Sequence, residues 1–180
     1  DFMEYGELIR LKEIEELVEK YYNEGYFQNA IEFITKNLYS TPFDFYEDFA
    51  GYWELKDYDK VSNSRIKLYE ILFDFYKYKE FEDIHIFKDL LRFDFISNNK
   101  GSRIPKDLFS RNKLIDQRKI HDILKDKRII ENYLQEYENM PTKKLLREVA
   151  VEEFKVNIFE IIHNGYNPNY GRGEIVVLFI

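Results

Sequence analysis

Apolar and aromatic residues recur at intervals of three and four along most of the first 97 positions, and few residues interrupt them. The first such series is Leu8, Leu11, Ile14, Val18 and Tyr21. This spacing places the series on one face of an amphipathic helix. The chain has only 7 Gly and 4 Pro in 180 residues, fewer than a turn-dense sandwich or barrel needs. The pattern therefore predicts a predominantly helical fold.

Helix boundaries can be placed from capping residues and breaks in the periodicity. Thr41 followed by Pro42, with Asp44 three residues after Thr41, resembles a capping box. Asn98 to Arg111 contain turn formers and give the best internal break. We predict helices over residues 5–24, 27–39, about 41–55, 64–79, 83–97 and 112–139, the last as one bent or two separate pieces joined near Asp126. This amounts to six or seven helices.

The C-terminal part changes its period. Residues 149–162 are mostly β-branched or aromatic with rough alternation, and residues 175–180 are entirely apolar. Between them lies a segment dense in turn formers. We predict two strands that form an antiparallel hairpin, and because a lone hairpin is marginal in water, this hairpin must pack on the helices.

These elements define the expected architecture. The fold class is mainly α, a multi-helix bundle with a C-terminal antiparallel β-hairpin, and the 16 Phe and 15 Tyr predict a core rich in aromatic rings. We expect a single domain over 1–180, helical over 1–140, with a hairpin appendage over 146–180. Residue 1 is Asp rather than Met, and we interpret the chain as a C-terminal fragment of a longer protein.

The chain contains few residues that carry chemistry. It has no Cys, which excludes a disulfide scaffold, a thiolate zinc site and a cysteine-ligated iron–sulfur cluster. The histidines are 36 and 42 residues apart and none sits in a metal-ligand array. They are His85, His121 and His163. Gly171 and Gly173 precede a strand rather than a helix, so they do not form a phosphate site.

Carboxylates are plentiful and could be proposed as acid–base pairs. The candidates are Glu13, Glu15, Glu16, Glu152 and Glu153. Runs of this kind are usually solvated faces, and a sequence does not show the burial that would shift a pKa. We therefore predict no catalytic, cofactor-binding or metal-binding residue in this chain, and hence no cofactor.

Charge is unevenly distributed along the chain, whose net charge is -7. Residues 1–60 hold 6 basic and 15 acidic side chains, whereas residues 101–147 hold 12 basic and 7 acidic ones. The basic stretch can pair with acidic groups within the fold or meet nucleic acid. Seven acids interleave with it, so we expect no nucleic-acid contact. No apolar run is long enough for a membrane span, and we expect a cytoplasmic protein without a membrane partner.

Two further features of the residues give structural hypotheses. Arg65 and Asp94 lie in strongly apolar surroundings, so we expect each to be paired, either with the other or with other residues. Tyr22, Tyr26, Trp53 and Tyr58 are candidates for the contact patch of a freestanding helical protein-interaction module, because aromatic residues are enriched at binding hot spots. The alternative is that most of these rings are core.

Six stretches together resemble a known family. They are LKEIEELVEKYYN at 11–23, FDFYEDFA at 43–50, SRIKLYEIL at 64–72, LRFDF at 91–95, VEEF at 151–154 and VVLF at 176–179. In this order they resemble the uncharacterised C-terminal domain, a domain of unknown function, of cobalamin-binding radical SAM proteins, also called Fe–S oxidoreductases. The resemblance covers nearly the whole chain.

The resemblance implies a non-catalytic accessory or substrate-gating domain, whose partner is the radical SAM barrel of the same polypeptide. The parent protein would hold an iron–sulfur cluster, S-adenosylmethionine and cobalamin. None of these is expected in this fragment, since it has neither the three cysteines of the cluster motif nor the Asp-x-His-x-x-Gly motif of the cobalamin domain. No catalytic residue is carried over.

Overall fold

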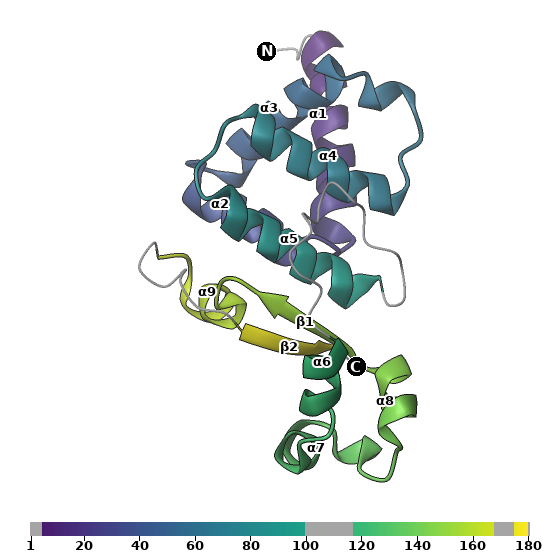
Figure 1. The fold of residues 1–180 in the computed structure, drawn as a ribbon. Helices are drawn as coiled ribbons and strands as arrows, with labels where there is room; N and C mark the ends of the chain where they lie inside the picture. Colours follow the sequence, from purple (N-terminus) through teal and green to yellow (C-terminus); the bar gives the residue numbers. More distant parts are fainter. Residues whose placement is uncertain (1–4, 100–116, 168–174, 180) are drawn as a thin grey trace.

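The computed structural model describes residues 5–99, 117–167 and 175–179, and these are mainly helical (Figure 1). The α-helices of the described residues are α1 (Tyr5–Val18), α2 (Gln28–Asn37), α3 (Pro42–Leu55), α4 (Arg65–Tyr78), α5 (Ile84–Asn98), α6 (Gln117–Ile123), α7 (Lys127–Tyr133), α8 (Thr142–Glu148) and α9 (Ile158–Asn164). The strands are β1 (Ala150–Phe154) and β2 (Ile175–Phe179), and short π- or 3-10-helical turns cover Glu19–Asn23, Tyr58–Lys60 and Gln135–Tyr137. The mainly α fold class is thus confirmed.

Helices α1 to α5 form a helical body around aromatic rings. Tyr76 and Phe87 stack with their ring centroids 4.0 Å apart, and Tyr21 packs against Phe27 at 4.7 Å. All four rings are fully buried. Burial of such rings is the largest favourable contribution to a core of this kind. The prediction of a ring-rich core is confirmed.

Local capping explains several helix starts. At α3, the Asp44 amide donates to Thr41 Oγ1 over 3.1 Å and the Thr41 amide donates to Asp44 Oδ2 over 2.9 Å, which is the predicted capping box. Ser64 accepts from the Lys67 amide at the start of α4. Asp126 caps α7, so the predicted joint after α6 lies at this residue.

The first helix differs from its predicted pattern in one respect. Its buried face begins only at Ile14 and continues with Leu17, whereas Leu8 and Leu11 are exposed. The helix continues as a π-helical turn to Asn23, and Gly25 follows with a φ of 75°. The N-terminal half of α1 therefore carries apolar side chains that the described part of the fold leaves uncovered.

The two strands pair antiparallel, as predicted, with Val151 opposite Leu178 and Phe154 opposite Ile175. Side chains alternate between the two faces of a strand. Phe154 and Val177 belong to the core of the helical body, whereas Val151 belongs to a second apolar cluster with Leu124, Leu134, Leu145 and Val149. The sheet thus lies between α5 and a small lobe made of α6 to α8, residues 117–149 (Figure 1).

Two salt bridges show that the two faces of β1 contact different parts of the fold. Glu152 pairs with Arg92 of α5, and Glu153 pairs with Lys119 of α6 over 2.6 Å. Arg92 also donates to the Glu153 carbonyl over 2.9 Å, and Asp89 of α5 accepts from the Lys155 amide over 2.9 Å. The strand pair therefore packs on the helices, as its marginal stability requires.

The C-terminal part also corrects the predicted element boundaries. The first strand ends at Phe154 rather than near Ile162, because Asn157 caps α9 by accepting from the Glu160 amide. Ile158 and Ile161 are both buried and their spacing suits a helix as well as a strand. Helix α8 was likewise not predicted, and with α9 it raises the helix count above the expected six or seven.

Some predictions concern residues outside the described ranges. These are the loop from residue 100 to 111, the beginning of the predicted helix at 112–116, and the pair Gly171 and Gly173. Among the helices of the described residues, none combines the length and apolar character that a membrane crossing requires.

Candidate functional site

A groove of about 380 Å³ lies between α2 and α9, with α5 beneath it. This volume falls within the range of pockets that hold small ligands. Its walls are Asn29, Glu32, Phe33, Lys36 and Asn37 of α2, Leu90 of α5, and Ile161, Ile162, His163, Asn164, Gly165 and Tyr166 from α9 and the residues after it. Both apolar and polar side chains line the groove.

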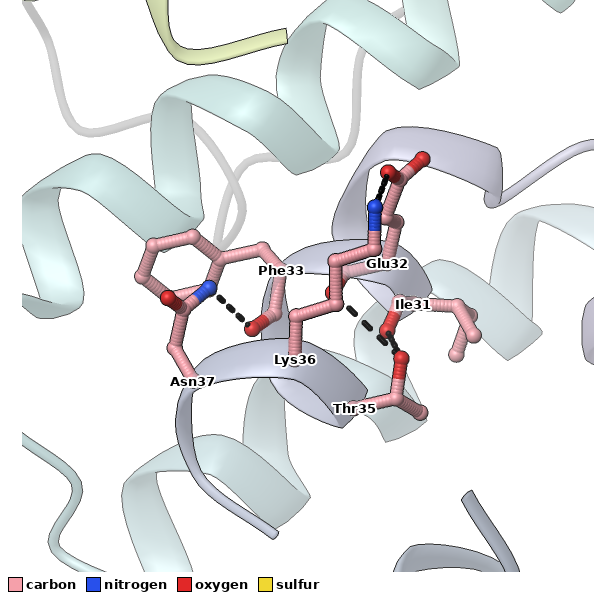
Figure 2. A network of polar contacts seen from close by, with 6 residues as sticks. All are labelled: Ile31, Glu32, Phe33, Thr35, Lys36 and Asn37. Atoms are coloured by element: carbon pink, nitrogen blue, oxygen red, sulfur yellow. Dashed lines mark hydrogen bonds and ion pairs between the residues drawn. The ribbon is translucent and has the colours of Figure 1, made fainter. Parts of the chain in front are cut away.

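Contacts within α2 orient the first wall, as Figure 2 shows. Asn37 Nδ2 donates to the Phe33 carbonyl over 2.8 Å, and the Lys36 ammonium pairs with the Glu32 carboxylate. Thr35 Oγ1 donates to the Ile31 carbonyl over 2.8 Å. Each contact joins residues four apart, which are neighbours on a helix surface.

A buried carboxylate holds the start of α2. The residue before this helix, Phe27, has no side chain that can cap it. Asp94 of α5 takes this role: it accepts from the Ala30 amide over 2.9 Å, the Asn29 amide over 3.3 Å and Asn29 Nδ2 over 2.6 Å. Asp94 is only 2% exposed, and this burial raises its pKa to about 7 although the three donors act in the opposite direction.

The structure also resolves the hypothesis about Arg65 and Asp94. The two residues do not pair with each other. Asp94 is buried and bonded to the start of α2, whereas Arg65 is exposed and its guanidinium lies 3.6 Å from the centroid of the Tyr26 ring. This is a cation–π contact, so each residue has a partner of its own.

The second wall comes from α9. His163 Nδ1 lies 2.7 Å from the Phe159 carbonyl oxygen. Because a carbonyl only accepts, Nδ1 carries the proton, and in the neutral ring Nε2 has a free lone pair. Tyr166, which follows the turn at Gly165, donates its hydroxyl to Asp83, and its ring lies 5.2 Å from that of Phe33. Burial and the Asp83 carboxylate raise the pKa of Tyr166 to about 12.

A second hollow lies among α1, α3 and α4, and several of its charged groups already have partners in the chain. Arg10 donates to the Glu47 carbonyl over 2.7 Å. Lys79 pairs with Asp48 over 2.7 Å, and Tyr39 donates to the same carboxylate. The groove between α2 and α9 is therefore the better candidate for a binding site.

The histidines and glutamates weighed from the sequence do not come together. Of the three histidines, only His163 lies at the groove. The described residues contain no group of side chains that could hold a metal ion. Glu13 pairs with Arg10 and Glu16 with Lys20 nearby in the sequence, whereas Glu152 and Glu153 pair with Arg92 and Lys119. In the basic stretch, Arg128 and Lys119 both pair with carboxylates of the chain.

The aromatic contact patch suggested by the sequence is not assembled. Trp53 is 5% exposed and belongs to the core, and Tyr26 and Tyr58 pack partly against that core. Only Tyr22 of the four candidates is exposed, at 66%. For Trp53 the alternative of a core ring is correct, because its helix, α3, turns this side chain toward Tyr21 and Phe49.

The groove itself was missed from the sequence. Its polar residues come from two segments, 29–37 and 161–166, that are more than 120 positions apart. Asparagine and histidine at these positions form no motif. Nothing in the sequence distinguishes Asn29 and Asn37 from the other polar residues of α2.

The geometry thus defines a helical domain with a two-stranded sheet and a groove of ligand size. A family model matches residues 1–179, and the chain belongs to this family, described as Protein of unknown function (DUF4080). Comparison with curated proteins and with solved structures finds no match to the chain.

Proposed function

We propose that this chain is a non-catalytic accessory or substrate-gating domain of a cobalamin-dependent radical SAM enzyme, acting in the cytoplasm beside the barrel of the same polypeptide. The proposal rests on the six stretches that resemble such domains in order. In the structure these stretches contribute core residues: Tyr21, Phe49, Tyr69, Phe95 and Phe154 are at most 1% exposed. The resemblance therefore rests on residues that build the core. A resemblance of this kind favours a structural domain over a catalytic site.

The observation that favours a packing role over a chemical one is the use made of the carboxylates. Asp94 accepts hydrogen bonds from the start of α2, and Asp89 accepts one from the residue after β1. Glu152 and Glu153 form salt bridges that join the sheet to α5 and α6. Each of these acids connects one element to another. They support a domain that is built for stable packing.

The N-terminal half of α1 is the surface that we assign to the contact with the barrel. Leu8, Ile9 and Leu11 are 45%, 43% and 39% exposed. Leu8 and Leu11 lie one turn apart on the same face, and Ile9 lies next to them. Adjacent exposed aliphatic side chains favour contact with another surface.

The first test is the native polypeptide that contains this segment. Its mass and the sequence upstream of Asp1 should reveal a much longer chain with a Cys-x-x-x-Cys-x-x-Cys array. A native chain that starts near Asp1 would contradict the proposal and favour the alternative, a freestanding interaction module. Calorimetry on the 180-residue chain should detect no binding of cobalamin or S-adenosylmethionine, and micromolar binding of either would contradict this part.

The second test concerns the assigned surface in the full-length protein. Replacing Leu11 by Glu should loosen the contact and increase hydrogen exchange in α1. Leu146 on α8 is a matched control, since it is 41% exposed and lies on the far lobe. If Leu146→Glu and Leu11→Glu change α1 exchange equally, the α1 surface does not make the contact.

A further inference from the structure

The polar side chains of the groove between α2 and α9 leave acceptor atoms for a ligand. Asn37 turns its amide nitrogen toward the Phe33 carbonyl, so its oxygen is the atom left over, as Figure 2 shows. Asn29 turns its amide nitrogen toward Asp94. Because Nδ2 and Oδ1 lie on opposite sides of an amide, both oxygens remain without a partner in the described residues.

His163 and Glu32 add two further acceptors. The proton of His163 is on Nδ1, which donates to the Phe159 carbonyl, so Nε2 of the neutral ring can only accept. The Glu32 carboxylate uses Oε1 for the Lys36 ammonium and leaves Oε2. Four acceptors from two helices thus line one groove.

Two donors of the same lining already have partners. The Tyr166 hydroxyl donates to Asp83, and the Lys36 ammonium is paired with Glu32. A ligand that brings its own N–H groups would satisfy these acceptors, whereas an anion would meet the carboxylate of Glu32. The net charge of -7 adds a favourable long-range field for a cation.

The apolar part of the groove indicates what kind of chain the head group of the ligand is attached to. Phe33, Leu90 and Ile161 lie beneath the polar atoms, and the Tyr166 ring stands 5.2 Å from the Phe33 ring. An aliphatic chain would pack on these side chains, and a cationic head group could also lie on an aromatic face.

We propose that this groove binds a guanidinium or primary ammonium group carried on an aliphatic chain. The head group donates to the free oxygens of Asn29, Asn37 and Glu32, and the chain packs on the apolar side chains below. Lys36 competes with the ligand for Glu32. This inference concerns the groove alone and does not depend on whether the chain is joined to a radical SAM barrel.

The test uses agmatine as the probe, with binding followed by NMR shifts of the Asn side-chain amides and of His163, and by calorimetry. Glu32→Gln should weaken binding about tenfold, because it removes one charge-assisted contact. Lys36→Ala should strengthen binding by about threefold or more, since it removes the competing cation. A role of these two residues in helix stability alone would not change affinity in opposite directions.

The side-chain amide of Asn37 has a matched control in the same chain. Asn132 of α7 makes the same contact as Asn37, donating to the carbonyl four residues earlier over 2.7 Å, and it lies outside the groove. Asn37→Ala should weaken agmatine binding about fivefold, and Asn132→Ala should leave it unchanged.

Three results would overturn the proposal: no agmatine binding at millimolar concentration, weaker binding by Lys36→Ala, or stronger binding of acetate than of agmatine. A capped Gly-Arg-Gly peptide distinguishes the two sources of the head group. Tighter binding of the peptide than of agmatine would identify an arginine side chain of a protein as the ligand, and tighter binding of agmatine a free small cation.

Discussion

Replacing Asp94 by Asn should change how the stability of this protein depends on pH. In the folded protein, burial raises the pKa of Asp94 to about 7 from its ordinary value of 3.8. The folded state therefore binds a proton between these two values that the unfolded state has lost. By linkage, the contribution of Asp94 to the free energy of unfolding falls as pH rises from about 4 to about 7 and is constant above that range.

The magnitude follows from the size of the shift. A difference of about three pKa units corresponds to about 4 kcal/mol over the whole window. The Asp94→Asn variant has nearly the same shape and does not titrate, so it removes this dependence while other acids stay the same. Urea unfolding followed by circular dichroism should be measured for both proteins at several pH values from 4 to 8.

The difference in unfolding free energy, native minus variant, should fall with pH through this window and then level off. A carboxyl-carbon NMR titration of Asp94 should show a midpoint near 7. If the difference is flat or rises with pH, the three N–H donors and the N-terminus of α2 outweigh burial, and the argument from desolvation is refuted.

Three further experiments test ion pairing, helix capping and buried hydroxyl groups. Arg92→Met removes a salt bridge, a hydrogen bond and a cation–π contact between α5 and β1 from a side chain that is 12% exposed. The free energy of unfolding should fall by about 2 kcal/mol. The exposed control Arg147→Met should change it by less than about 0.5 kcal/mol in the same urea experiment. Thr41→Ala removes the capping box of α3 and should cost about 1 kcal/mol, measured by thermal unfolding. Tyr46→Phe should leave the free energy of unfolding unchanged or raise it, because this buried hydroxyl has no partner among the described residues. Tyr69→Phe loses a 2.8 Å hydrogen bond to the Tyr26 carbonyl. It should lower the free energy of unfolding by about 1 kcal/mol in the same measurement.

Most helix positions of the helical body were predictable from the sequence, because each depends on residues within about four positions. The periodic stripes of α3, α4 and α5 and the caps at Thr41 and Ser64 are of this kind. The predictions were less accurate beyond residue 140. Short apolar runs such as residues 158–162 suit a strand and a helix equally, and the cap at Asn157 decides between them.

The candidate groove was not predictable in the same way. Its acceptors belong to α2 and α9, and their orientation depends on partners such as Asp94 and the Phe159 carbonyl. The surface character of the aromatic residues was also undetermined, since a ring on an amphipathic helix can face the core or a partner. Trp53 and Tyr22 illustrate the two outcomes.

The sequence by itself determined that the chain is mainly helical, that its core is aromatic and that its last residues form a strand, because hydrophobic periodicity and capping are local properties. Only the tertiary structure decided that Asp94 caps α2, that Glu152 and Glu153 face opposite layers, and that Asn37 and His163 share a groove. These relations join residues far apart in the chain, so they arise only when the helices and the sheet pack together.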